Sequence, residues 1–135
     1  MTRRRFAQLS CIAAGRRVLG DASPLNAAAD FTLEIGPYLL EASPKHSFHT
    51  VAYNGQVPGP LLRMTEGRPV TIAVHNGSRD PEVVHWHGLF LPSEIDGAVE
   101  EGTPMSAPGA TARYTFQPAP AGLRWYTTHV FAGNN

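Results

Sequence analysis

Two histidines flank one tryptophan in the stretch His85-Trp86-His87 of this 135-residue chain. In a β-strand, residues i and i+2 point to the same face, so the two imidazoles would project together while Trp86 points into a core. At a rise of about 3.3 Å per residue the two histidines lie roughly 7 Å apart along the strand, which suits two neighbouring metal ions better than one. Imidazole nitrogen favours copper, zinc, iron or nickel.

A third histidine occurs in the stretch Arg124-Trp125-Tyr126-Thr127-Thr128-His129. In a strand, Trp125, Thr127 and His129 share one face. If this strand lies beside the first, His129 joins His85 and His87 in a partial metal site. From the residues alone, the alternative is that all three are ordinary core or surface histidines of a β-protein. The other histidines, His46, His49 and His75, are interpreted as surface or edge residues.

Short strands and turns must position these side chains. Apolar residues alternate at 31, 33 and 35 and again at 70, 72 and 74, which is the period of a half-buried strand. Gly36-Pro37 is expected to break the first strand, Asn54-Gly55 and Asn76-Gly77 predict turns, and residues 92–109 predict a long loop. No helical period extends over 12 or more residues after residue 30. The strands predicted on this basis are 31–42, 46–54, 69–76, 82–91, 110–118 and 123–131.

This pattern predicts an all-β domain, a Greek-key β-sandwich or barrel. The 13 glycines and 12 prolines suit many turns rather than long helices. Lysine plus arginine and aspartate plus glutamate both number 11, so the net charge is zero and gives no case for nucleic acid or an anionic membrane as partner. No apolar run approaches the roughly 20 residues that span a bilayer.

The first 29 residues are set apart from the folded part. Arg3-Arg4-Arg5-Phe6 followed by a short apolar stretch resembles a twin-arginine export signal, and the alternative is a flexible, disordered basic leader. An export signal would place the protein in the periplasm or otherwise outside the cytoplasm. Residues 30–135 then form the single predicted domain.

Four motifs, in order, carry a family resemblance: YNGQVPGPLLRMTEGRPVTIAVHN (53–76), HWHGLFLPSEIDGA (85–98), GTPMSAPGATARYTF (102–116) and GLRWYTTH (122–129). Together they resemble the N-terminal, plastocyanin-like (cupredoxin) domain of multicopper oxidases such as laccases, ferroxidases and copper-resistance oxidases. The resemblance extends over about residues 31–131. It implies a cupredoxin-like Greek-key β-sandwich with copper as cofactor. It assigns His85 to a type 2 copper and His87 and His129 to type 3 coppers of a trinuclear cluster.

The chain departs from the family pattern at Thr127, which stands where the family has a further type 3 histidine. A hydroxyl is a poor copper ligand near neutral pH. In addition, a type 1 copper needs a thiolate, and Cys11 in the leader is the one cysteine. The complete family enzyme, an oxidoreductase, oxidises a substrate at type 1 copper and reduces dioxygen to water at the cluster.

We therefore expect this chain alone to lack the type 1 centre and oxidase activity. Its domain is expected to be truncated at the C-terminal end, as in a fragment of a longer oxidase. Further cupredoxin domains or another subunit would complete the cluster. Two alternatives stay open: a non-enzymatic periplasmic copper-binding or partner protein, and a structural β-sandwich whose metal site has decayed.

Overall fold

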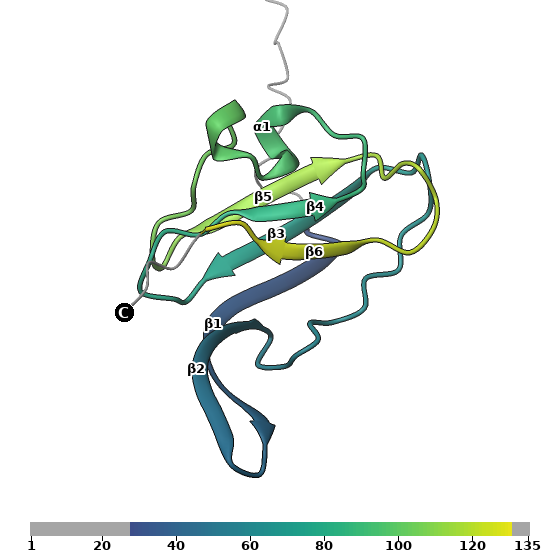
Figure 1. Cartoon of the computed structure of the whole chain (residues 1–135). Coiled ribbons are helices and arrows are strands. Elements are labelled where there is room, and N and C mark those ends of the chain that lie inside the picture. The colour runs from purple at the N-terminus through teal and green to yellow at the C-terminus, as the bar shows by residue number, and fades with distance from the viewer. Residues whose placement is uncertain (1–27, 131–135) are drawn as a thin grey trace, which may run out of the picture.

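The structure, a computed structural model, describes residues 28–130 and consists mainly of β-strands (Figure 1). The predicted export signal lies outside the described residues. Two short helical segments interrupt the loop predicted over 92–109, and among the described residues no helix is long and apolar enough to cross a membrane. The elements are β1 (Phe31–Ser43), β2 (His46–Tyr53), β3 (Val70–Asn76), β4 (Val84–His87), α1 (Ser93–Asp96), the 3-10 helix η2 (Val99–Glu101), β5 (Thr111–Phe116) and β6 (Trp125–Thr128).

The strands form two sheets. A four-stranded sheet has the order β2-β1-β3-β5, in which β1 is parallel to β3 and the other pairs are antiparallel. A second sheet consists of β4 and β6, paired antiparallel. Their apolar faces meet in one core, so the predicted all-β sandwich is confirmed.

Strand β1 runs unbroken through Gly36-Pro37, so the predicted break there was wrong. The Ile35 carbonyl accepts a hydrogen bond from Gly77 on the β3 side, and Pro37 has the same parity as Ile35. Its missing N–H therefore faces the side where pairing with β3 has already ended at Ile35–Asn76. Proline is tolerated at such an open edge because no ladder hydrogen bond is lost.

The turn predicted at Asn54-Gly55 is confirmed. Both residues have positive φ, 51° for Asn54 and 64° for Gly55, as a type I′ turn requires. Asn54 also ties the turn to β1, because its Oδ1 accepts a hydrogen bond from the Glu34 N–H at 2.7 Å. The chain then leaves β2 into the irregular segment at 58–64, where the Pro60 carbonyl accepts a hydrogen bond from Tyr126 of β6 at 2.7 Å.

Trp86 is the largest side chain in the core and is only 2% exposed. Its ring contacts Tyr114 and Phe116 of β5, with centroid separations of 5.3 Å in both cases, and Tyr126 of β6 at 5.7 Å. The tryptophan of β4 thus joins the two sheets. The remaining buried members of this core are Leu33, Ile35, Val70, Ile72, Val74 and Val84.

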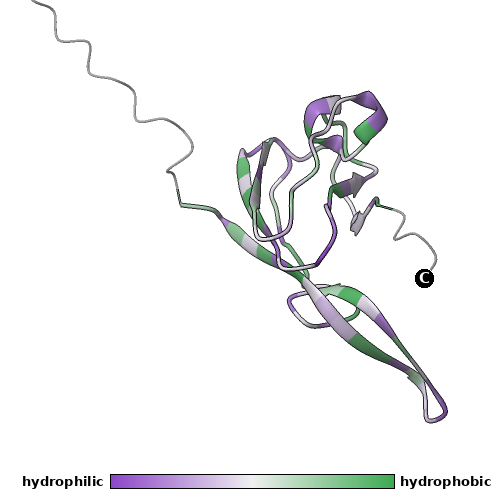
Figure 2. Ribbon diagram, turned by 90° about the vertical axis from the view of Figure 1, so that its left-hand side faces the viewer, coloured by the Kyte–Doolittle hydropathy of each residue, from purple (hydrophilic) through white to green (hydrophobic). Residues whose placement is uncertain are grey.

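The far half of β1 and β2 forms a two-stranded ribbon that extends away from the sandwich (Figure 2). Residues 38–43 of β1 pair with residues 46–50 of β2 and with no other strand. Leu39 and Phe48 on this ribbon are about half exposed, at 48% and 50%. The ribbon therefore adds length to the sheet without contributing to the main core.

A buried asparagine, the last residue of β3, connects the loops at this end of the sandwich. Asn76 is fully buried, and its Nδ2 donates hydrogen bonds to the backbone carbonyls of Asp80 (2.8 Å) and Ser106 (2.9 Å). Its Oδ1 accepts hydrogen bonds from the N–H and the hydroxyl of Ser78, at 3.0 and 2.7 Å. One side chain thereby holds together the two loops that lead into β4 and β5.

Replacing Asn76 should destabilise the domain strongly. Asn76→Ala removes all four hydrogen bonds of a fully buried side chain, and we expect the free energy of unfolding to fall by about 3 kcal/mol. The matched control is Ser78→Ala, which removes a partly exposed hydroxyl that contacts Asn76 and Asp80 and should cost about 1 kcal/mol or less. Urea denaturation followed by tryptophan fluorescence measures both, and equal losses in the two variants would contradict this role of Asn76.

Candidate metal centre

Strand β4 places His85 and His87 on one face and Trp86 on the other, as the alternation predicted. The His85 and His87 ring centroids are 5.5 Å apart and the rings are nearly perpendicular, at 88°. His85 is partly buried and His87 exposed, whereas Trp86 is buried. The burial of Trp86 therefore fixes the side of the sheet on which both imidazoles lie.

Strand β6 brings the third predicted histidine to the same face. Thr127 of β6 lies directly across from His85, and Trp125 lies across from His87. Just beyond β6, the backbone N–H of His129 donates to the Val83 carbonyl at 3.1 Å, which extends the pairing by one step. The His129 ring centroid then lies 5.4 Å from that of His85.

The three histidines thus form a row with His85 between the other two. His87 at one end stacks on Trp125, with a centroid separation of 4.9 Å and an interplanar angle of 28°. Among residues 28–130, no three or more His, Cys, Asp or Glu side chains converge closely enough to hold one metal ion. The row therefore presents imidazoles side by side without closing around a single ion.

Hydrogen bonds orient two of these rings. His85 Nδ1 donates to the backbone carbonyl of Asp96 at 2.6 Å, and His129 Nδ1 donates to the carbonyl of Gly97 at 3.1 Å. The Asp96 carboxylate is also near, with Oδ2 3.8 Å from His85 Nδ1. Neither Nε2 has a hydrogen-bond partner among the described residues, so both are open to a ligand.

The donor set fits copper in part. Three imidazoles, two of them held through Nδ1 in the manner usual for metal-bound histidines, are suitable copper ligands. Thr127, in the middle of the row and opposite His85, supplies only a hydroxyl. The residues on these two strands can therefore serve as one side of a copper site.

Two backbone carbonyls that contact the candidate ligands, those of Asp96 and Gly97, could not be predicted from the sequence. A backbone carbonyl is present at every position, so residue type gives no signal for it. The glycine after α1 is the nearest available hint, because a left-handed glycine commonly ends a helix.

The other histidines lie apart from this row, as interpreted from the sequence. His75 on β3 contacts the Thr111 hydroxyl through Nδ1 at 3.2 Å, and His46 at the start of β2 contacts Ser43 in the same way at 3.1 Å. His49 also lies on β2, in the projecting ribbon. No two of these histidines are in ring contact with each other or with the row among the described residues.

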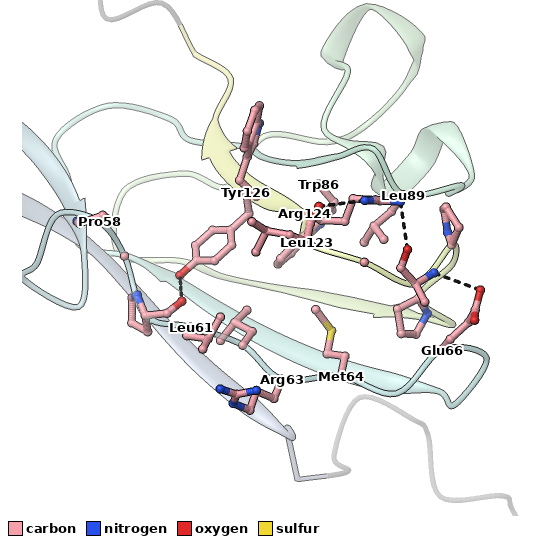
Figure 3. A pocket seen from close by; sticks show the side chains of 18 residues that line it. Pro58, Leu61, Arg63, Met64, Glu66, Trp86, Leu89, Leu123, Arg124 and Tyr126 are labelled. Atoms are coloured by element: carbon pink, nitrogen blue, oxygen red, sulfur yellow. Dashed lines mark hydrogen bonds between the residues drawn. The ribbon is translucent and has the colours of Figure 1, made fainter.

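The opposite face of β4 and β6 borders an apolar hollow of about 680 Å³ (Figure 3). It lies between segment 58–64 and segment 121–126, and Trp86 and Tyr126 form part of its wall. The Tyr126 hydroxyl donates to the Pro60 carbonyl at 2.7 Å, and burial raises the pKa of this phenol. The hydroxyl thus stays a neutral donor that ties β6 to segment 58–64.

A family model described as "Multicopper oxidase" matches residues 39–134. The chain belongs to the multicopper oxidase family. Membership implies copper as the metal, and it agrees with the imidazole donors on β4 and just beyond β6.

Similar proteins include a multicopper oxidase and a copper resistance protein from two bacteria. Multicopper oxidase MmcO of Mycobacterium tuberculosis (strain ATCC 25618 / H37Rv) is 38% identical over 81 residues, or 60% of this chain and 16% of the relative. Copper resistance protein A of Pseudomonas syringae pv. tomato is 35% identical over 100 residues, or 74% of this chain and 16% of the relative. The chain thus spans about a sixth of the length of these two relatives.

Solved multicopper oxidases share the fold of this domain. The blue copper oxidase of Nitrosomonas europaea superposes with a TM-score of 0.72 and 38% identity, over 77% of this chain and 33% of that one. A multi-copper oxidase of Pseudomonas thermotolerans gives a TM-score of 0.67 and 32% identity, over 76% of this chain and 26% of that one. The β-sandwich of this multicopper oxidase domain is therefore cupredoxin-like.

Glu82 links β6 of the multicopper oxidase domain to the loop that contains Ser106. Its carboxylate accepts a hydrogen bond from the Thr128 hydroxyl, and its backbone exchanges two hydrogen bonds with Ser106, at 2.9 and 2.7 Å. The residue is only 6% exposed. Burial raises the pKa of Glu82 above its ordinary value, the negative charge of Asp80 adds to this, and the Thr128 hydrogen bond opposes it.

The raised pKa of Glu82 predicts a pH dependence of stability. Between the ordinary pKa of 4.5 and the higher folded pKa, the folded chain binds this proton more tightly than the unfolded chain. The contribution of Glu82 to the free energy of unfolding is therefore full below 4.5 and is lost as pH rises through the folded pKa.

In Glu82→Gln this loss should disappear, whereas Glu41→Gln, at an exposed position on β1, should keep the wild-type profile. Urea unfolding at a series of pH values from about 4 to 8 compares the three proteins. Superimposable profiles for wild type and Glu82→Gln would contradict the prediction.

Proposed function

We propose that this domain binds copper through His85, His87 and His129 and supplies one side of a trinuclear copper cluster. His85 serves the type 2 copper, and His87 and His129 serve the type 3 coppers. The observation that carries the proposal is the row of three imidazoles on β4 and just beyond β6, two of which have no Nε2 partner among residues 28–130. The bound coppers would supply the chemistry of dioxygen reduction.

His87, Thr127 and His129 are exposed, which suits a site completed by another domain. Relatives that match this chain are several times longer, because it spans 16% of two of them. We propose that further cupredoxin domains or another subunit provide the remaining cluster ligands. The type 1 copper, which needs a thiolate, is proposed to lie there as well, since Cys11 is the one cysteine of this sequence and precedes the domain.

Export belongs to the same proposal. The arginine pair followed by Phe6 supports transport by the twin-arginine route, which carries folded proteins, and hence a periplasmic or otherwise exported location. An exported copper protein is compatible with a copper-resistance role, which one relative's name states for that relative.

A second candidate function rests on Thr127. A hydroxyl directly opposite His85 leaves one type 3 position without its imidazole. This observation favours non-enzymatic copper binding, or a purely structural sandwich, over a full contribution to dioxygen reduction. Copper titration of the purified chain separates non-enzymatic copper binding from a purely structural role, because a structural sandwich has no copper site that depends on His85.

Removal of the central histidine should abolish most copper binding. His85 contacts both neighbouring rings, so His85→Ala is expected to weaken Cu(II) affinity at least about tenfold in competition with a chromophoric chelator. The matched control is His75→Ala, which removes an imidazole from β3 away from the row and should leave affinity unchanged. Equal affinities for wild type and His85→Ala would refute the proposed site.

Restoring the missing imidazole should have the opposite effect. Residues directly across an antiparallel pair have Cβ atoms about 5 Å apart, so Thr127→His places a fourth ring beside His85. We expect Cu(II) affinity to rise about tenfold or the stoichiometry to increase. Thr65→His adds a histidine at an exposed position outside the row and serves as the control. If Thr127→His binds copper no better than Thr65→His, the ligand assignment is wrong.

A further inference from the structure

The turn Asp96-Gly97, called the corner below, contacts both His85 and His129. Helix α1 ends at Asp96, and Gly97 follows in the left-handed conformation with φ of 94°. The consecutive carbonyls of Asp96 and Gly97 accept hydrogen bonds from Nδ1 of His85 and Nδ1 of His129, respectively. One ring from β4 and one from just beyond β6 are thus oriented by the carbonyls of two consecutive residues.

These hydrogen bonds decide which nitrogen of each ring carries the proton. A carbonyl oxygen can only accept, so each Nδ1 must be protonated in the neutral ring, and the lone pair lies on Nε2. This is the opposite of the tautomer that a neutral histidine prefers in water. The corner therefore holds both rings with Nε2 ready to bind a metal before any metal is present.

The corner packs closely against β4. A Cβ at position 97 would lie 2.4 Å from the Val84 carbonyl oxygen and 2.5 Å from the His85 Cα. Only glycine permits this approach, since real Cβ atoms do not come so close to backbone. The backbone of Gly97 is in this way packed directly against the strand that carries His85.

A buried threonine holds the corner from the other side. Thr103 is 2% exposed, and its Oγ1 accepts a hydrogen bond from the Gly97 N–H at 3.0 Å. The same hydroxyl donates to the Ser93 carbonyl at the start of α1. The backbone N–H of Thr103 donates to the Ala98 carbonyl at 3.1 Å, so Thr103 contacts the segment 93–98 at its start, at Gly97 and at its end.

We propose that Gly97 and Thr103 are positioning residues for the metal centre. They hold the corner against β4 and thereby set the tautomer and orientation of His85 and His129 as a pair. The effect on copper rests on the proposed function, whereas the effect on the tautomers is a property of the metal-free chain. Neither Gly97 nor Thr103 is proposed as a metal ligand.

The tautomers can be measured directly in the metal-free protein. Two-bond ¹H–¹⁵N NMR of the imidazoles in the full chain, recorded in mildly alkaline buffer, distinguishes Nδ1–H from Nε2–H. We expect the Nδ1–H tautomer at both His85 and His129. The Nε2–H tautomer at either residue in the wild-type protein would overturn the proposal without any variant.

Variants at Thr103 test the coupling between the two rings. Thr103→Val keeps the shape of the side chain but removes the hydroxyl, and the Nδ1–H population should fall at His85 and His129 together. Thr103→Ser keeps the hydroxyl and should restore both. Unchanged tautomers in a folded Thr103→Val protein, or a change at only one histidine, would contradict a shared corner. His46 and His75 serve as internal references.

Two glycines of the same loop provide a second, matched comparison. Gly97 and Gly102 both have positive φ, but a Cβ at Gly102 would meet nothing within 4 Å. Gly97→Ala should therefore shift both tautomers, while Gly102→Ala carries the same type of backbone strain and should shift neither. Equal tautomer populations in these two variants would refute the role of Gly97.

Copper affinity tests whether the positioning of the two rings matters for the proposed copper site. Thr103→Val should weaken Cu(II) binding about tenfold, within the range usual for groups that orient metal-bound histidines, and Thr103→Ser should recover it. If the tautomers respond as expected but His85→Ala leaves copper affinity unchanged, the proposed copper site fails while the positioning of the rings stands. If copper binding depends on His85 but not on Thr103, the positioning proposal fails and the site stands.

Discussion

The burial of Trp86 between the two sheets is the constraint on which the candidate site depends. A one-residue slip of β4 would turn this ring to solvent and both flanking histidines into the core, because side chains alternate along a strand. Removing a buried aromatic ring from such a position costs about 3 to 5 kcal/mol. The apolar contacts of Trp86 with Tyr114 and Phe116 thus fix the polar face of the strand.

From that constraint the pairing of β4 with β6 follows. Once Trp86 and Tyr126 face the core together, Thr127 lies across from His85 and His129 continues along the same face. Hydrophobic packing on one side of a two-stranded sheet therefore determines which donors gather on the other. The family assignment implies copper as the metal, and the copper site proposed for this row contains Thr127, which supplies only a hydroxyl.

Much of this arrangement could be predicted from the sequence because it depends on alternation and on turn chemistry. The face shared by His85 and His87 follows from the period of two, and Asn54-Gly55 specifies its own turn. The path of β1 through Pro37 could not be predicted, because it depends on where the pairing with β3 ends. The hydrogen bonds from the histidines to the carbonyls of Asp96 and Gly97 could not be predicted either, because only tertiary packing brings these backbone atoms to a histidine.

The ribbon of β1 and β2 beyond residue 37 bears on how the domain opens. Its tip pairs only with itself, and Leu39 and Phe48 remain half exposed, so little buried apolar surface holds it closed. Local opening free energies in proteins range from near zero to the global value, according to how much packing an opening breaks. The ribbon can therefore fray as a separate cooperative unit while Leu33 and Ile35 stay in the core, leaving the row of histidines undisturbed.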